Sequence, residues 1–180
     1  MVSSVVEKNL SDWKFLGHSV HSLSIIPEDH KSKTDDEKGP AILLIHGFGA
    51  STTHWRHNLP VLGKQYEVHA LDLLGFGKSS KPGGLAYGGP LWKDQIVSYV
   101  KEKIGRPTIL VGNSLGGYAA LASGAALGAD AAGVVLLNAA GYFSEDKKPT
   151  KGFWNTARKT VAGIFLKNAL LQRIIFENLR

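Results

Sequence analysis

The sequence predicts an α/β fold with a mostly parallel, doubly wound sheet, and three observations lead to this prediction. Four apolar runs recur along the chain, at residues 41–45, 66–71, 108–111 and 133–137. Helical patterns separate these runs, and strands that alternate with helices favour parallel pairing with helices on both faces. Glycine-rich turns follow the runs, as tight connections between strands and helices require.

The individual elements follow from local pattern. Residues 13–18 and 21–26 are predicted as two short strands joined by a tight turn, and the charged stretch 28–38 as a surface loop. Ala41–Ile45 is apolar at every position, which is typical of a strand buried on both faces of a parallel sheet. Helices are expected where apolar residues recur at helical spacing, over 53–62, 91–104 and 115–127.

Composition narrows the classes of function. Lys and Arg number 21 against 15 Asp and Glu, a net charge of +6, but these charges are scattered rather than gathered in a stripe, so no nucleic-acid partner is expected. The absence of cysteine excludes a disulfide framework and a cysteine nucleophile. His54 and His57 lie three residues apart, but no further metal ligand stands at suitable spacing, so we expect neither a metal nor another cofactor.

The N-terminal residues do not suggest a secretory signal. Residues 1–10 include Glu7 and lack the apolar core of a secretory signal, and no window has the ~18 apolar residues of a membrane span. We expect a cytoplasmic protein, or a plastid or thylakoid-associated one if the cell is photosynthetic.

The most informative motif is Gly-Asn-Ser-Leu-Gly at 112–116, which lies between an apolar run and an Ala-rich stretch. A serine on a sharp, strained turn from strand to helix presents its hydroxyl as a nucleophile. The residues two before and two after it must lack side chains, as Gly112 and Gly116 do, and Gly117 allows close packing of the helix. We predict Ser114 as the nucleophile; the alternative is a glycine-rich helix start with an incidental serine.

A second loop is expected to support the serine. His46-Gly47-Phe48-Gly49 follows the first long apolar run. The backbone N–H groups of Phe48 and Leu115 are predicted to form an oxyanion hole for an acyl intermediate, with the Phe48 ring lining the pocket. His46 could serve as a catalytic base, but a hydrogen bond to the backbone that shapes the loop is the favoured interpretation.

A third turn, Asp72-Leu-Leu-Gly-Phe-Gly-Lys-Ser79, follows the next apolar run. Asp72 could be the acid of a catalytic triad, but we favour a role in ordering its own turn. Ser79 or Ser80 is expected to cap a short helix.

These three motifs, at 46–49, 72–79 and 112–117, occur in the order and spacing of the α/β-hydrolase superfamily. The chain resembles in particular the esterase-like hydrolases of photosynthetic organisms, including the pheophytinase group, which carries the same Gly-Asn-Ser-Leu-Gly-Gly-Tyr turn. It is similar more distantly to epoxide hydrolases and haloperoxidases. The resemblance covers about residues 13–142.

The resemblance implies an incomplete α/β-hydrolase fold. Residues 1–141 would form the N-terminal part of the core, and 142–180 the start of a helical cap. Relatives carry the acid and histidine of the triad after two further strands, whereas no histidine follows His69 in this sequence. We therefore expect a truncated chain without useful turnover, and an unpaired strand at 133–137 that favours aggregation.

The function implied is hydrolysis of a small hydrophobic ester through an acyl-enzyme at Ser114, without a cofactor. The same fold also serves haloperoxidase, epoxide-hydrolase and C–C bond hydrolase chemistry, and a catalytically dead binding protein is a further alternative. The basic amphipathic stretch 152–180 would cover the substrate pocket as part of the cap; peripheral contact with a membrane is the second interpretation.

Overall fold

A computed structural model describes residues 6–9 and 13–140 of the chain. All of these belong to one compact unit, Met1–Tyr142. The cap expected at 142–180, including its amphipathic stretch, lies outside the described residues.

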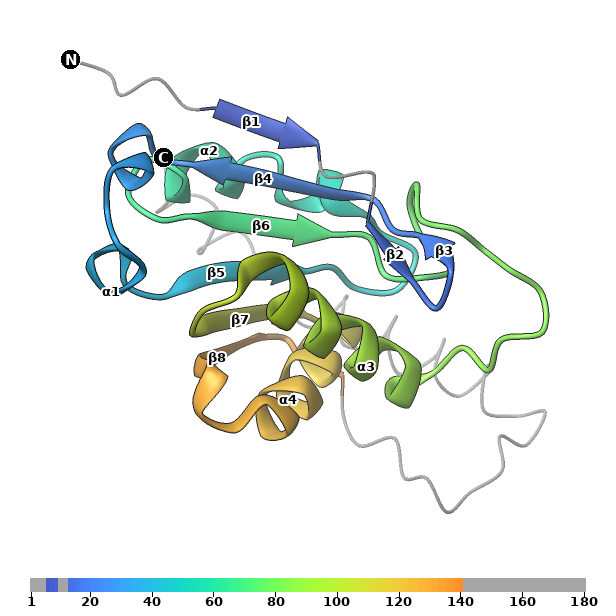
Figure 1. The fold of residues 1–180 in the computed structure, drawn as a ribbon. Coiled ribbons are helices and arrows are strands. Elements are labelled where there is room, and N and C mark those ends of the chain that lie inside the picture. Colours follow the sequence, from blue (N-terminus) through green and yellow to red (C-terminus); the bar gives the residue numbers. More distant parts are fainter. Residues whose placement is uncertain (1–5, 10–12, 141–180) are drawn as a thin grey trace. The chain divides into compact units, whose positions relative to one another are not determined.

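The centre of this unit is a six-stranded sheet with the order β1-β4-β6-β5-β7-β8 (Figure 1). Its strands are β1 (Val6–Asn9), β4 (Ser22–Ile26), β5 (Ala41–Ile45), β6 (Val68–Leu71), β7 (Thr108–Asn113) and β8 (Ala131–Leu137). The four strands β5 to β8 run parallel, while β4 pairs antiparallel with β6, and β1 with β4. The mostly parallel sheet predicted from the sequence is confirmed.

Helices lie on both faces of the sheet (Figure 1). The helices are α1 (Asp35–Lys38), α2 (Asn58–Leu62), α3 (Gly89–Tyr99) and α4 (Leu115–Leu127). Short turns complete them: η1 (Glu28–Lys31), η2 (Thr52–Trp55), the π-helical η3 (Val100–Ile104) and η4 (Gly128–Asp130). Helices α3 and α4 cover one face and α2 the other, as a doubly wound sheet requires.

Strand β5 shows why an uninterrupted apolar run predicts a central strand. Side chains alternate between the faces of a strand. Leu43 and Ile45 join the core under α3 and α4, whereas Ile42 and Leu44 pack with Trp55 in a second core on the opposite face. Each position of β5 therefore needs an apolar side chain.

The N-terminal strand prediction was wrong in one respect. Residues 13–18 do not form one strand; β2 (Lys14–Phe15) and β3 (His18–Ser19) form a separate hairpin. Leu16 and Gly17 connect them with φ angles of 50° and 78°. Two successive residues with positive φ make the tight turn that suits a hairpin, and leucine gives little sequence signal for it.

The structure differs from the sequence prediction in two other segments, 53–62 and 28–38. The single helix expected at 53–62 is divided into η2 and α2, with Pro60 in the first turn of α2, where a missing N–H costs no intrahelical bond. The loop expected at 28–38 contains η1 and α1, and α1 begins with a capping box in which the Thr34 N–H donates to the Glu37 carboxylate over 2.8 Å.

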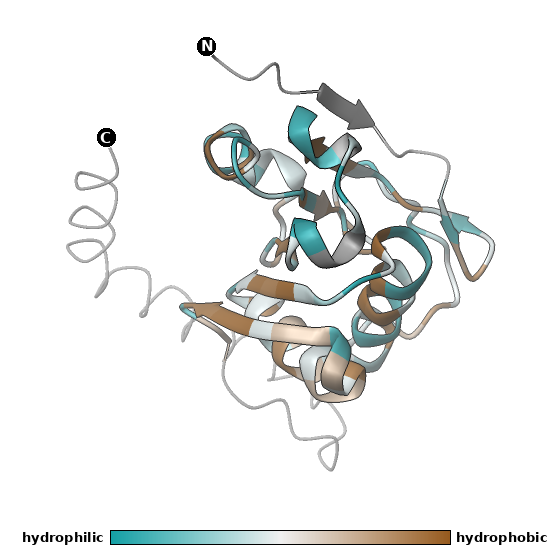
Figure 2. Cartoon of the chain, turned by 60° about the vertical axis from the view of Figure 1, so that its left-hand side comes forward, coloured by the Kyte–Doolittle hydropathy of each residue, from teal (hydrophilic) through white to brown (hydrophobic). Residues whose placement is uncertain are grey.

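Strand β8 differs from β5 in its exposure. Figure 2 shows the apolar character of β8, the last strand in the order of the sheet. Within the described residues β8 pairs only with β7, and Val135, Leu136 and Leu137 are 43%, 44% and 39% exposed.

Candidate active site

Ser114 lies at the junction between β7 and α4. Its backbone has φ 52° and ψ −115°, a strained conformation for a residue other than glycine. The end of β8 holds it there: the Ser114 N–H donates to the Leu137 carbonyl over 3.0 Å, and the Ala140 N–H donates to the Ser114 carbonyl over 2.8 Å. The residue is partly exposed and lies outside any continuous helix, in the sharp turn between strand and helix.

The glycines of this turn are required by backbone contacts. A Cβ at Gly112 would lie 2.1 Å from the Gly116 carbonyl oxygen, and one at Gly116 would lie 2.3 Å from the Ile45 carbonyl oxygen. A Cβ at Gly117 would lie 2.7 Å from the Ala139 Cβ. Strand β7, the turn at Ser114 and helix α4 are therefore packed so closely that no side chain fits at these three glycines.

The loop after β5 lies directly against the serine. A Cβ at Gly47 would be 3.2 Å from the Ser114 Cβ, and Gly49 has a φ of 70°, which favours glycine. Leu115 opens α4, so its N–H belongs to the first turn, where amides have no acceptor within the helix. The structure thus brings the Phe48 loop, Ser114 and Leu115 together; the oxyanion role of the two amides stays a prediction.

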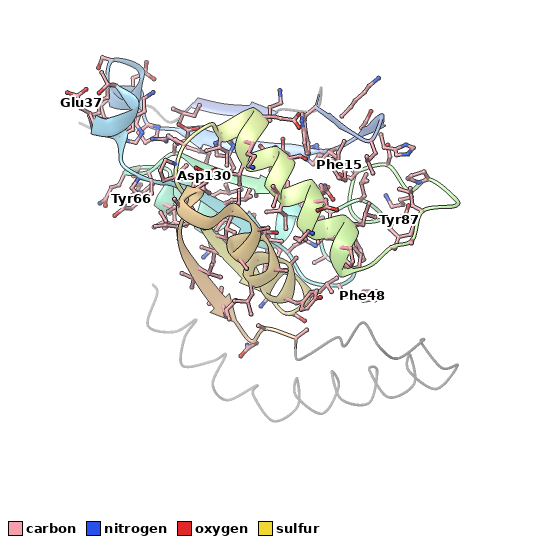
Figure 3. All side chains as sticks on the ribbon, turned by 60° about the horizontal axis from the view of Figure 1, so that its bottom comes forward. Phe15, Glu37, Phe48, Tyr66, Tyr87 and Asp130 are labelled. Carbon is pink, nitrogen blue, oxygen red and sulfur yellow. The ribbon has the colours of Figure 1, made fainter. Side chains whose placement is uncertain are left out.

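An aromatic cluster extends from this loop. Phe48 is 64% exposed, and its ring centroid lies 5.4 Å from that of Phe76, which in turn is 5.7 Å from His46 and 5.8 Å from Trp92. Figure 3 shows Phe48 and Tyr87 at the same end of the molecule, where the parallel strands end. Neither Phe76 nor Trp92 was expected at the site from the sequence.

Both ring nitrogens of His46 are engaged by the backbone. Nε2 accepts a hydrogen bond from the Leu73 N–H over 3.1 Å, so the proton is on Nδ1, which donates to the Gly47 carbonyl over 2.7 Å. The side chain is fully buried, and burial lowers its pKa. This neutral imidazole fastens the loop after β5 to the turn after β6, and has no nitrogen left to act as a base.

Both oxygens of the Asp72 carboxylate also accept hydrogen bonds from the backbone. The carboxylate is fully buried; Oδ1 accepts from the Thr52 N–H over 2.6 Å and Oδ2 from the Lys78 N–H over 2.7 Å. Gly77 has a φ of 51°, and a Cβ there would overlap Oδ2 at 2.1 Å. Asp72 therefore orders its own turn and also ties it to the start of η2.

Three polar side chains of this region were missed or misplaced by sequence reasoning. Gln95 is fully buried in α3; its Oε1 accepts from the Leu74 N–H and its Nε2 donates to the Asp72 carbonyl. Trp92 Nε1 donates to the Leu74 carbonyl over 3.0 Å. Ser79, expected to cap a helix, instead donates its hydroxyl to the Asp72 carbonyl over 2.7 Å. The sequence signal that could have identified Gln95 is its position among the apolar residues of α3.

Two adjoining cavities open at this end of the sheet, with volumes of about 460 and 350 Å³. Ser51, Thr53 and Gly77 line both of them, whereas Ser114 lines neither. Within the described part of the chain, no three His, Cys, Asp or Glu side chains are grouped as metal ligands. None of the helices described there combines the length and apolar character of a membrane span.

The motifs and the geometry of the serine turn agree with a match to known proteins. Residues 42–176 match the alpha/beta hydrolase family. The chain belongs to this family. It is 32% identical over 151 residues to the chloroplastic pheophytinase of Arabidopsis thaliana, covering 67% of this chain and 31% of that protein. It is 35% identical over 83 residues to the pimeloyl-[acyl-carrier protein] methyl ester esterase of Aeromonas hydrophila, covering 46% of this chain and 31% of that protein.

A solved structure agrees with the fold. The structure of a membrane phospholipase A, described as a bacterial virulence factor, matches with a TM-score of 0.65 and 27% identity, covering 86% of this chain and 46% of that one. The α/β-hydrolase fold predicted from the three motifs is therefore confirmed. The chain spans about a third of the length of the two curated relatives.

Proposed function

We propose that the protein is a serine hydrolase that cleaves a hydrophobic carboxylic ester through an acyl-enzyme at Ser114. The observation that carries this proposal is the strained, partly exposed turn that holds Ser114 against the loop 46–49. A nucleophile in this position attacks a carbonyl carbon beside two sets of backbone amides, those of the loop and those of the first turn of α4.

The reaction proceeds in two steps. The Ser114 oxygen forms a bond to the carbonyl carbon, its proton passes to a base, and the alcohol leaves; water then releases the acid and restores the serine. The amides of Phe48 and Leu115 stabilise the negative oxygen in both steps. Both ring nitrogens of His46 are committed to the backbone, so His46 does not serve as this base.

The aromatic cluster supports a hydrophobic substrate. Phe48 and Phe76 offer an apolar surface immediately beside the loop that contacts Ser114. Burial of an acyl or alcohol group on such a surface is favourable by roughly 25 cal/mol for each Å² of apolar area. One relative is by name a methyl ester esterase, which agrees with an ester as the substrate.

Labelling by a fluorophosphonate probe tests the nucleophile. We expect one adduct, located at Ser114 by mass spectrometry and abolished by Ser114→Ala. Ser32→Ala, which removes an exposed hydroxyl bonded to the Asp29 carbonyl, should leave labelling unchanged.

A folded protein that stays unlabelled, or whose labelling survives Ser114→Ala, would contradict the proposal and favour a binding protein. A panel of p-nitrophenyl esters tests the substrate class: kcat/KM should rise with acyl length. Labelling at Ser114 without turnover of any ester would instead favour cleavage of another bond by the same serine.

A further inference from the structure

The two cavities form one recess beside the loop 46–49. Ala50 and Arg56 line the smaller cavity and Lys78 the larger one, and the shared lining joins the two volumes. The recess is therefore built from the segment after β5, the turn after β6 and the start of β4, which contributes His21 and Leu23. Asp72 ties the first two segments together by accepting a hydrogen bond from the Thr52 N–H.

The cations of this recess lack carboxylate partners. Neither Arg56 nor Lys78 forms an ion pair anywhere in the described residues. Arg56 uses Nη1 to donate to the Thr53 carbonyl over 3.3 Å, which leaves most of its N–H groups for a ligand. Lys81 adds a third cation close by, because its ammonium group donates to the Gly77 carbonyl over 2.6 Å.

The single carboxylate among the described lining residues does not compete for these cations. Both oxygens of Asp72 already accept backbone N–H groups. The remaining polar lining includes the hydroxyls of Ser51 and Thr53, which lie 2.8 Å apart. Arginine and lysine beside hydroxyl donors are the groups that bind carboxylate and phosphate oxygens.

The recess lies at the right distance from the nucleophile to hold another part of the same substrate. The Ala50 N–H donates to the Gly47 carbonyl over 3.2 Å and closes a turn, so Ala50 lies within about 7 Å of Gly47. Gly47 itself contacts Ser114. The near edge of the recess is thus roughly 10 Å from the serine, which agrees with the two strand spacings of about 4.8 Å that separate β6 from β7.

We propose that this recess binds an anionic oxygen group, a carboxylate or a phosphate, carried by the substrate at a distance of several bonds from the group that Ser114 attacks. The place of this group in the reaction rests on the proposed function; the binding itself does not. The substrate would then be amphiphilic, with its apolar part on Phe48 and Phe76 and its anion near Arg56 and Lys78.

Titrations followed by NMR test the recess without any turnover. Succinate and inorganic phosphate are the anionic probes, and succinamide is the neutral control. We expect an anion to shift the amide signals of Ser51, Thr53 and Gly77, and to bind more weakly at high salt. The tighter of the two anions identifies the chemistry of the group.

Variants of the lining cations make the test specific. Arg56→Gln and Lys78→Gln should each raise the Kd of the better anion at least tenfold. Lys101→Gln removes the same charge from an exposed position in η3, away from the recess, and should change the Kd less than twofold.

Equal binding of succinamide, an unchanged Kd in both Arg56→Gln and Lys78→Gln, or an equal loss in Lys101→Gln would overturn the proposal. Ser114→Ala should bind the anion as the native protein does. Intact fluorophosphonate labelling without anion binding would refute this inference alone, and the reverse result would refute only the proposed nucleophile.

Discussion

Two residues of types common in catalytic triads, His46 and Asp72, have a structural role at this site. His46 and Asp72 are both fully buried, and each uses both of its side-chain polar atoms on the backbone of loops at the ends of β5 and β6. A histidine and an aspartate in the loops near Ser114 suggest a catalytic triad from residue types alone. Their hydrogen bonds show that they instead hold the surrounding loops in position.

Replacement of Asp72 by asparagine tests this structural role. The amide can accept only one of the two N–H groups, from Thr52 and Lys78, and turns its own NH₂ toward the other. We expect Asp72→Asn to lower the free energy of unfolding by about 1–3 kcal/mol, measured by urea denaturation. The exposed Asp94→Asn should change it by less than about 0.5 kcal/mol. Native stability in Asp72→Asn would contradict the assignment.

At the scale of elements, the serine turn depends on β8 as much as on β7 and α4. The backbone of Ser114 is bonded to Leu137 at the end of β8 and to Ala140 just beyond it. The strain at Ser114 is therefore maintained by a strand that lies at the edge of the described sheet. The stability of this edge and the backbone geometry at Ser114 are therefore coupled.

Within the described residues the edge of β8 that faces away from β7 has no partner strand, which predicts self-association of the 180-residue chain. Unpaired apolar strands recruit further strands, and a charge on the strand opposes this. We expect Leu136→Lys, at a position 44% exposed, to shift the chain toward monomer in sedimentation velocity. Val61→Lys introduces the same charge at an exposed position of α2 and should not do so. A native chain that is monomeric at all concentrations tested would refute the prediction.

At the scale of the whole described unit, two apolar cores enclose the sheet and bury polar groups at its end. Burial lowers the pKa of His46 below the 6.5 of an ordinary histidine. As pH falls through 6.5, the unfolded chain binds a proton at this residue and the folded chain does not. The contribution of neutral His46 to the free energy of unfolding is therefore fully present above pH 6.5 and decreases as the pH falls below it.

Thermal unfolding at several pH values tests this linkage. The Tm should fall between about pH 7.5 and about pH 5. His46→Asn should lower the Tm at neutral pH, because two loops lose their bonds, but should reduce the fall on acidification. His57→Asn, at an exposed position, should keep the native pH dependence. An equally steep fall in His46→Asn would show that other groups dominate.

The sequence alone determined the alternation of strands and helices, the burial of β5 on both faces of the sheet, and the glycine-dependent turn around Ser114. These features depend on local spacing: an apolar run marks a buried strand, and two glycines flank the serine because backbone contacts at 2.1 and 2.3 Å leave no room for a Cβ. The bounds of α4 were predicted to the residue, Leu115–Leu127, for the same reason.

Only the tertiary structure decided the partners of His46 and Asp72, the buried role of Gln95, the hairpin at 14–19 and the recess lined by Arg56 and Lys78. The partners of these side chains are mostly backbone groups on other elements, and backbone groups are the same in every sequence. Parallel pairing of β5 with β6 brings residues 49–56 beside residues 72–78. Register and loop path determine such contacts, and neither is encoded in the spacing of residues along one segment.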